Sequence, residues 1–367
     1  LMIIILTQCF PSRIGGIENL VSNLALGLGK KEKVIVFADR HHLFYDAIYD
    51  NQYKDKIIVR RTGGLKFFRR RKKIRDLKPF VESKQIKLVI ADTWKSLELC
   101  IDLLDKKKIS TSCLVHGNEL LSSNKKKTQR IIRILNRAGS IIANSQFTVG
   151  LVKKLIKNKD NIKFVYSGAN DLRQIQSDNF MKLKGNPVLI TLARLEKRKG
   201  HAVILEAVKK LTSDFPLIQY IIAGAGSEKS NLQRLVKEYA LEKNVSFVGL
   251  VNESQKKYLF EHTDLMVMPT IDESENRSVE GFGIAYLEAA FFGIPSIASN
   301  VGGTKEAVLH NKTGIIINNI DDLFQSIHEL LINSNHRKQL GNEAQKRAIQ
   351  DFNWDIVTNK YLNAINN

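Results

Sequence analysis

Cysteine is scarce in this chain, which contains only Cys9, Cys100 and Cys113, all far apart in the sequence. An odd number of scattered cysteines does not form a disulfide framework, and their spacing is not that of a zinc site. We therefore expect buried free thiols and a reducing cytosol.

Long apolar runs are also missing. No stretch reaches the roughly 18 apolar residues of a transmembrane helix. The first segment, Met2–Leu6, is too short for a span and lacks the basic n-region of a signal peptide, so we predict a buried first strand. The chain has 367 residues, 43% hydrophobic and 26% charged, which is typical of a soluble globular protein with two domains.

Negative charge is scarce in the first half. Residues 1–170 hold 34 Lys and Arg against 14 Asp and Glu, whereas the remainder holds 23 of each, so the whole net charge of +20 lies in the first half. A surface of one sign usually meets an anionic partner, such as nucleic acid, acidic lipid or a polyanionic substrate.

Short apolar strand candidates alternate with helical stretches along the whole chain. This alternation predicts an α/β protein with doubly wound parallel sheets. The pattern lapses into polar sequence around Ser167–Lys184 and resumes with the apolar segment Pro187–Leu192. We therefore predict a first domain over 1–168, a linker over 169–185, a second domain over 186–350 and a terminal helix over 351–367 that crosses back to the first domain.

The stretch Ser278–Pro295 is the centre of the chain's chemistry. It predicts a loop that carries Glu280, followed by a helix from about Gly283 that carries Glu288. The free N–H groups at that helix start favour a diphosphate, and carboxylates accept hydrogen bonds from sugar hydroxyls. These N–H groups belong to Phe282, Gly283 and Ile284. The alternative is a surface loop before a core helix, with both glutamates merely solvated.

The two glutamates, separated by seven residues with Gly-Phe-Gly-Ile after the first, resemble the signature of retaining nucleotide-sugar glycosyltransferases of family 4. The resemblance covers nearly the whole chain. It implies the GT-B fold: two facing Rossmann-like domains with an active-site cleft between them. The acceptor would bind on the N-terminal domain and the nucleotide sugar on the C-terminal domain.

The resemblance implies a role for each motif on the donor side. Arg194 and Lys199 would neutralise the leaving diphosphate, Glu280 would hold the sugar hydroxyls, and Glu288 would hold the ribose. The backbone at Val251 would contact the base. Because two cations can stabilise a diphosphate and no Asp-x-Asp pair occurs, we expect no metal and no other cofactor.

Two motifs of the first half complete this set. Gly15 and Gly16 follow the first strand, where the family has a Gly-Gly pair near the donor diphosphate and the acceptor. His116 follows an apolar strand, where the family places a histidine against the transferred sugar. No covalent nucleophile is expected.

The polar insertion 270–276 resembles the lipid-mannosyltransferase branch. We therefore expect transfer of a hexose from GDP-mannose or a UDP-hexose, with retention, to a membrane-associated acceptor of cell-envelope biosynthesis. The acceptor would be a glycolipid, a diacylglycerol or a lipid-linked saccharide.

A basic segment with two phenylalanines suggests a membrane surface. We expect a cytoplasmic enzyme bound to the inner face of the membrane through this segment. The alternative is a solvated basic helix whose phenylalanines point into the core. The residues expected at the membrane are Lys66, Phe67, Phe68, Arg69, Arg70, Arg71, Lys72 and Lys73.

Three other functions remain open. A sugar-nucleotide 2-epimerase has the same fold but does not require a basic first half. A nucleic-acid-binding protein would explain the charge, although no recognition module is visible and no nucleic-acid partner is expected. A sensor that binds a sugar nucleotide without catalysis is the third.

Overall fold

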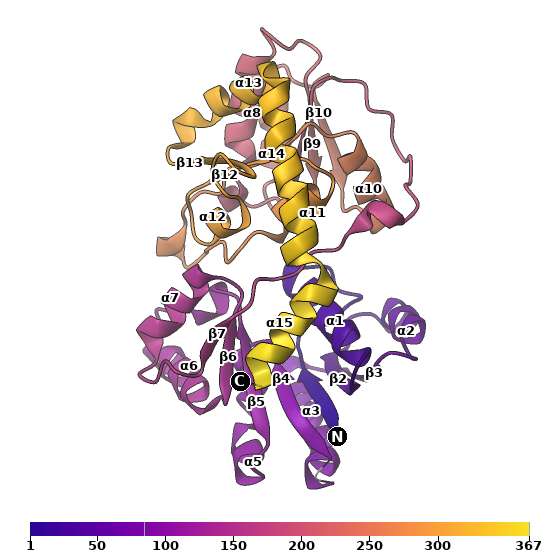
Figure 1. Ribbon diagram of the computed structural model, residues 1–367, viewed down its shortest axis with the longest axis vertical. Coiled ribbons are helices and arrows are strands. Elements are labelled where there is room, and N and C mark those ends of the chain that lie inside the picture. Colours follow the sequence, from indigo (N-terminus) through magenta and orange to yellow (C-terminus); the bar gives the residue numbers. More distant parts are fainter. Residues whose placement is uncertain (84, 367) are drawn as a thin grey trace. The chain divides into compact units, whose positions relative to one another are not determined.

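The computed structural model describes residues 1–83 and 85–366, and of Asn366 only the backbone. The chain divides into two compact units. Unit 1 comprises Leu1–Gly168 and Trp354–Asn367, and unit 2 comprises Ala169–Asn353. Each is a parallel sheet covered by helices on both faces (Figure 1).

Unit 1 has a seven-stranded parallel sheet in the order β3-β2-β1-β4-β5-β6-β7. The central strand β1 lies between β2 and β4, and Ile4 is in register with Ile35 and Val89. The strands are β1 Met2–Leu6, β2 Lys33–Asp39, β3 Ile58–Thr62, β4 Ile86–Ala91, β5 Ser110–Val115, β6 Ser140–Ala143 and β7 Ile162–Phe164.

The alternation of side chains along β1 supplies both cores of unit 1. Ile3 and Ile5 face the helix α1, whereas Ile4 and Leu6 face the opposite layer, which includes α3. The helices are α1 Gly16–Gly29, α2 Leu43–Gln52, α3 Lys66–Glu82, α4 Trp94–Leu97, α5 Ile101–Lys106, α6 Lys125–Arg137, α7 Gln146–Leu155 and α15 Trp354–Asn366.

The terminal helix α15 packs against α1 within unit 1 (Figure 1). Its Val357 and Tyr361 are fully buried in the core that β1 and α1 share. Gly27 of α1 lies close to Thr358, where any side chain on the glycine would collide with the threonine hydroxyl. The last helix is therefore an integral part of unit 1.

Unit 2 has a six-stranded parallel sheet in the order β10-β9-β8-β11-β12-β13. Consecutive strands run outward from β8 in both directions, as in a doubly wound domain. The strands are β8 Val188–Leu192, β9 Gln219–Ala223, β10 Val245–Gly249, β11 Leu265–Met268, β12 Ser296–Ser299 and β13 Gly314–Ile317.

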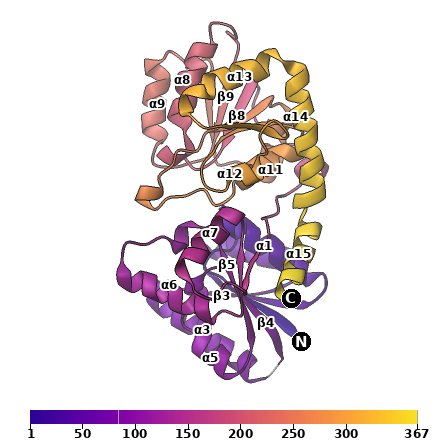
Figure 2. The ribbon, with the colours of Figure 1, turned by 60° about the vertical axis from the view of Figure 1, so that its left-hand side comes forward.

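Helices α8, α9 and α13 gather on one face of this sheet (Figure 2). They enclose a core with Leu189, Ile222 and Val267 of the strands. The helices are α8 His201–Leu211, α9 Lys229–Glu238, α10 Glu253–Glu261, α11 Ile284–Phe291, α12 Thr304–Ala307, α13 Leu323–Ile332 and α14 Ser334–Arg347. Short 3₁₀ turns occupy Asn118–Leu120, Leu172–Gln174, Lys197–Lys199, Ser274–Asn276 and Ile320–Asp322, and a π turn occupies Ala348–Phe352.

The stretch 169–185, expected to be a linker, belongs to unit 2. Lys257 Nζ of α10 donates to the carbonyl oxygens of Arg173 and Ile175, both at 2.8 Å. Tyr258 Oη donates to the carbonyl oxygen of Met181 at 2.6 Å. Side chains far along the chain supply these bonds, so the polar composition of the stretch does not reveal them.

Candidate active site

The loop after β8 is fixed by a glycine at its end. Gly200 has φ 73°, and a Cβ there would lie 2.2 Å from the carbonyl oxygen of Pro269. Only glycine fits this left-handed position, which ends the 3₁₀ turn Lys197–Lys199 and starts α8. The turn therefore holds its basic side chains against the segment that follows β11.

Glu280 is the point at which this basic turn meets the segment before α11. Its Oε2 atom accepts from Lys199 Nζ at 2.5 Å and from Arg198 Nη1 at 2.7 Å. Its main-chain oxygen accepts from Gly303 N at 2.9 Å. The largely enclosed Glu280 carboxylate is thus held by two cations, and the Glu280 backbone is held by the loop after β12.

The charge state of Glu280 follows from these contacts. Burial by itself would raise the pKa of Glu280, but the charges of Lys199 and Arg198, and their hydrogen bonds, outweigh it. The pKa of the carboxyl therefore lies below its usual range, and Glu280 is an anion at neutral pH.

Arg194 lies apart from this cluster. Its side chain is 67% exposed, and its guanidinium pairs with Glu196 at 2.6 Å. The sequence pattern singled out Arg194 and Lys199 and passed over Arg198, which lies between them. A buried arginine in a run of basic residues has no distinguishing mark until its partner is known, so composition could not identify it.

The helix α11 starts where the glutamate motif predicts. Its N-cap is Gly283, with φ 102°, and Ile284 is the first helical residue. The ring of Tyr286 packs over Gly283, so a Cβ at the glycine would lie 2.6 Å from the ring. The first N–H groups of an α-helix have no acceptor within the helix, which leaves this end suited to an anion. Phe282 is buried beside it.

Glu288 lies one turn into α11, and only 6% of its side chain is exposed. Its Oε1 atom accepts from Lys256 Nζ of α10 at 2.6 Å. The carboxylate expected to meet a ribose thus already has a cationic partner. Val251, expected to contact the base, is half-buried in the loop between β10 and α10.

Gly15 and Gly16 lie at the start of α1 in unit 1. Glu18 fills the space above Gly15, because a Cβ there would lie 2.2 Å from Glu18 Oε2. The Glu18 carboxylate is buried and pairs with Arg13 at 2.9 Å. A carboxylate of the chain itself therefore lies at the helix end where a diphosphate is expected, a feature that the glycine pair did not predict.

His116 lies at the end of β5, and its ring is oriented by the backbone. Nε2 is 2.8 Å from the carbonyl oxygen of Asp92, and the main-chain N donates to Glu119 Oε1 at 2.6 Å. Because a carbonyl oxygen only accepts, this contact assigns a proton to Nε2 and leaves Nδ1 available to a ligand.

The basic helix α3 presents both phenylalanines to solvent. Phe67 is 61% exposed and Phe68 is 64% exposed, so the alternative in which they enter the core is wrong. The guanidinium of Arg71 stacks 3.6 Å from the centre of the Phe67 ring. Lys66 and Lys72 are exposed beside them.

The expectation that Lys73 lies at the same surface is wrong. Lys73 Nζ is buried and donates to Asp39 Oδ1 and to the carbonyl oxygen of Thr7, both at 2.5 Å. Burial lowers the pKa of Lys73, against the opposing effect of Asp39. Its place on the inward stripe with Leu77 and Val81 explains this.

Two arginines of the same segment are also engaged inside the protein. Arg69 pairs with Asp39 at 3.0 Å, and Arg70 pairs with Glu98 at 2.9 Å. The exposed cations of the expected membrane surface are therefore Lys66, Arg71 and Lys72.

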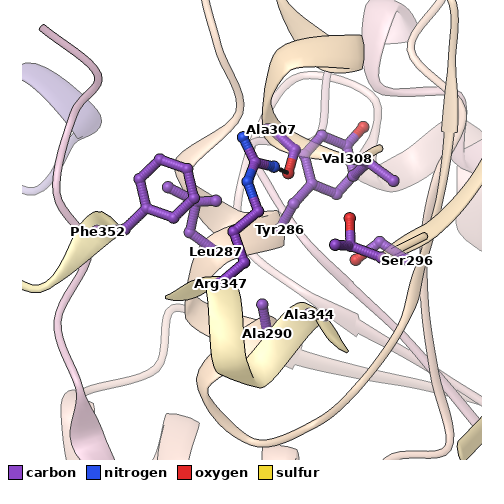
Figure 3. A pocket seen from close by; sticks show the side chains of 10 residues that line it. Tyr286, Leu287, Ala290, Ser296, Ala307, Val308, Ala344, Arg347 and Phe352 are labelled. Carbon is purple, nitrogen blue, oxygen red and sulfur yellow. Dashed lines mark hydrogen bonds between the residues drawn. The ribbon is translucent and has the colours of Figure 1, made fainter. Parts of the chain in front are cut away.

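A small cavity lies beside α11 (Figure 3). Its volume is about 10 Å³, which holds one water at most. Arg347 crosses it and donates to the carbonyl oxygen of Ala307 at 2.9 Å. This is a packing gap between α11 and α14, and it does not take a sugar nucleotide. It is lined by Tyr286, Leu287, Ala290, Ser296, Ala307, Val308, Thr313, Ala344, Arg347 and Phe352.

The structure also bears on metal-ligand clusters, membrane-spanning helices and disulfides. Over residues 1–83 and 85–366, no group of three or more His, Cys, Asp or Glu side chains is arranged to hold a metal ion. Within that same part of the chain, no helix has the length and apolarity needed to cross a membrane. The three cysteines are free thiols, and Cys100 and Cys113 are buried.

Comparison with family models divides the chain as the units do. The model described as Glycosyltransferase Family 4 matches residues 14–172, and the model described as Glycosyl transferases group 1 matches residues 172–347. Together they span nearly all of both sheets.

Two relatives have names that specify both donor and acceptor. A "GDP-mannose-dependent alpha-(1-6)-phosphatidylinositol monomannoside mannosyltransferase" of Mycobacterium tuberculosis is 29% identical over 49% of this chain and 47% of that protein. The match thus spans about half the length of that relative. A GDP-mannose-dependent enzyme of Corynebacterium glutamicum, named for a monoacylated form of the same acceptor, is 24% identical over 99% of this chain and 97% of its own.

A solved structure confirms the predicted fold class. Anabaena HepE, crystallised with UDP, superposes with a TM-score of 0.81 at 19% identity over the full length of both chains. This likeness concerns the fold: two Rossmann-like domains with parallel sheets of seven and six strands.

Proposed function

Because this chain belongs to the family 4 glycosyltransferases, we propose that it transfers a hexose from a nucleotide diphosphate sugar to a lipid-linked acceptor. The observation that supports this most is the Glu280 cluster. A buried carboxylate held by Lys199 and Arg198, close in sequence to the N-terminus of α11, provides an acceptor for sugar hydroxyls beside donors for a diphosphate.

The proposed chemistry is electrostatic. As the bond between sugar and diphosphate breaks, negative charge grows on the leaving phosphate oxygen, and Lys199 and Arg194 neutralise it. The N–H groups at Gly283 and Ile284 and those near Gly16 add to this stabilisation. Since these groups meet the charge of the leaving group, the proposed reaction requires no metal.

Each carboxylate has a separate role in this proposal. Glu280 accepts hydrogen bonds from the sugar hydroxyls and orients the ring. Glu288 accepts from the ribose, with its pair to Lys256 fixing the side chain. His116 offers Nδ1 to a hydroxyl near the 6-position of the sugar. We propose retention at the anomeric carbon, with the departing phosphate oxygen taking the acceptor proton and no covalent nucleophile on the enzyme.

We propose GDP-mannose as the donor and a phosphatidylinositol-type glycolipid as the acceptor. Two relatives support this, since both are named for GDP-mannose and for a phosphatidylinositol monomannoside. An anionic lipid acceptor also suits unit 1, because the whole net positive charge of the chain lies within residues 1–170. We further propose that unit 1 binds the cytoplasmic face of the membrane through the exposed residues of α3.

Thermal unfolding tests the donor site. We expect GDP and GDP-mannose to raise the unfolding temperature, because a ligand at 100 times its Kd adds about 2.7 kcal/mol to stability. The shifts with UDP, UDP-glucose and ADP, measured separately, show which base the site prefers. In Glu280→Gln, the shift with GDP should persist and the extra shift with GDP-mannose should vanish. No shift with any nucleotide would contradict the proposed function.

Transfer itself is measured with radiolabelled GDP-mannose and vesicles that contain phosphatidylinositol monomannoside. Label in the lipid fraction supports the proposal. Label that stays in the water phase while GDP is released would indicate hydrolysis and rule out this acceptor.

A further inference from the structure

Arg198 is more deeply buried than the lysine beside it. Only 4% of the Arg198 side chain is exposed, against 11% for Lys199. Its Nη1 donates to Glu280 at 2.7 Å, and Nη2 lies 3.8 Å from Glu196. Its main-chain oxygen accepts from Ile271 N at 2.8 Å. Arg198 is therefore tied to Glu280 by its side chain and to the segment after β11 by its backbone.

Lys199 has two different partners in the proposed reaction. In the structure its ammonium pairs with Glu280, whereas in the reaction it must neutralise the diphosphate. A buried carboxylate that is left without any cation strongly destabilises the folded protein. Glu280 therefore needs a second cation that stays with it when Lys199 turns to the phosphate.

We propose that Arg198 is a positioning residue: it is the permanent counter-ion that holds the Glu280 carboxylate in place, so that Lys199 is available to the donor diphosphate. This inference rests on the proposed function. The planar guanidinium, with Nη1 on Glu280 and Nη2 near Glu196, suits a permanent pair better than a flexible ammonium does.

Few other charged groups influence this pair. Burial raises the pKa of Glu280, and Lys199 and Arg198 lower it below its usual range. Glu196 lies on the other side of Arg198. The hydroxyl of Tyr286, whose pKa is raised by burial and by Glu280, donates to the carbonyl oxygen of Met268. Without Arg198, Lys199 would be the one remaining cation of the pair that lowers the pKa of Glu280.

A double-mutant cycle on thermal unfolding tests the pair without any substrate. We expect Arg198→Gln to lower the unfolding temperature by at least about 5 °C at pH 7.5, because it leaves the buried carboxylate with one cation. Adding Glu280→Gln should restore part of the loss. Lys197→Gln is the matched control, since it removes one charge from an exposed position on the same turn. Additive losses from the two substitutions would overturn the proposal.

The pH dependence has a defined sign. In the wild type the folded-state pKa of Glu280 is depressed, so its contribution to stability is present above the unfolded pKa and is lost as the pH falls. In Arg198→Gln the folded-state pKa should rise, so the variant loses less on acidification. The gap between the two unfolding temperatures should therefore narrow as the pH falls below about 5 and through the unfolded carboxyl pKa of about 4.3. A constant gap would indicate a purely structural role and overturn the proposal.

Binding affinities measured by calorimetry distinguish the role of Arg198 from that of Lys199. Arg198→Gln should reduce the advantage of GDP-mannose over GDP at least tenfold, while the affinity for GDP changes less than about threefold. Arg198→Lys should recover part of the advantage, and Lys199→Ala should weaken GDP itself. Equal loss of GDP affinity in Arg198→Gln and Lys199→Ala would place Arg198 on the diphosphate and overturn the proposal.

Failure of the proposed function gives a different result. If the wild type binds none of GDP, GDP-mannose, UDP and UDP-glucose, the proposed donor site is contradicted. The unfolding cycle then still decides whether Arg198 and Glu280 act as a pair.

Discussion

Lys199 and Arg198 show how neighbouring residues of one turn differ in role. Both donate to the same oxygen of Glu280, but they differ in burial and in what holds their backbones. The more exposed lysine can change partner, whereas the arginine is enclosed. At the scale of the residue, burial and partners decide function more than residue type does.

Lys199→Ala should lower kcat roughly 100- to 1,000-fold, as the loss of a group that stabilises developing charge commonly does. Donor hydrolysis or transfer under saturating GDP-mannose measures it. Lys197→Ala, an exposed neighbour on the same turn, should leave kcat within a factor of two. An unchanged kcat in Lys199→Ala would remove this lysine from the mechanism.

Glu288→Ala should mainly raise the KM for the donor, since a ribose contact contributes to binding of substrate and transition state alike. Because Lys256 loses its partner in this variant, Glu288→Gln is the better-folded comparison and should show a smaller change of the same kind. Initial rates over a range of GDP-mannose concentrations measure both. A fall in kcat at constant KM would argue against a ribose contact.

His201, at the start of α8, should make the folded state sensitive to acid. Burial lowers the pKa of this imidazole to about 4, with a smaller effect of Lys199 in the same direction. The unfolded chain takes up a proton near pH 6.5 and the folded chain does not, so stability falls between pH 6.5 and 4. Urea unfolding measures the free energy of unfolding across this range. In His201→Gln this free energy should depend less steeply on pH, by up to one bound proton. An identical slope in the variant would contradict the assignment.

At the scale of the element, local apolar patterns predicted the first strand and the central helix well. The strand predicted over Met2–Leu6 is β1, and the helix predicted from about Gly283 starts at Ile284. Such elements are set by local patterns of apolar residues and by glycines. Lys73 was misjudged and Arg198 was passed over because their partners, Asp39 and Glu280, lie on other elements, and only the tertiary structure brings them together.

The helix α15 should be essential to unit 1. Tyr361 is fully buried between α15 and the core of α1 and β1, so Tyr361→Ala should cost about 3–5 kcal/mol in the free energy of unfolding. Chemical denaturation measures this. Asn363→Ala, at an exposed position of the same helix, is the control and should change stability by less than about 0.5 kcal/mol. Equal effects would contradict the packing described.

At the scale of the whole molecule, charge is divided as the fold is. Residues 1–170, nearly all of unit 1, carry the entire net charge of +20, whereas the rest of the chain is neutral overall. This asymmetry is visible in the sequence, but which cations face solvent is not. Of the eight residues expected at a membrane, Lys73 is buried, and Arg69 and Arg70 are engaged in ion pairs. The exposed Phe67 and Phe68 distinguish α3 from other basic segments.

Vesicle co-sedimentation tests whether that distinction matters. Neutralising Lys66, Arg71 and Lys72 to glutamine should weaken binding to anionic vesicles roughly 100-fold, at about 1 kcal/mol per cation near the lipid. The control neutralises the exposed run Lys106–Lys108, which removes the same charge from a site without aromatic residues, and should weaken binding much less. If the two triple variants lose affinity equally, diffuse charge rather than α3 accounts for the attraction. Because a bound helix would also bury its phenylalanines, Phe67→Ser with Phe68→Ser should weaken binding even at high salt, where the charge contribution is screened.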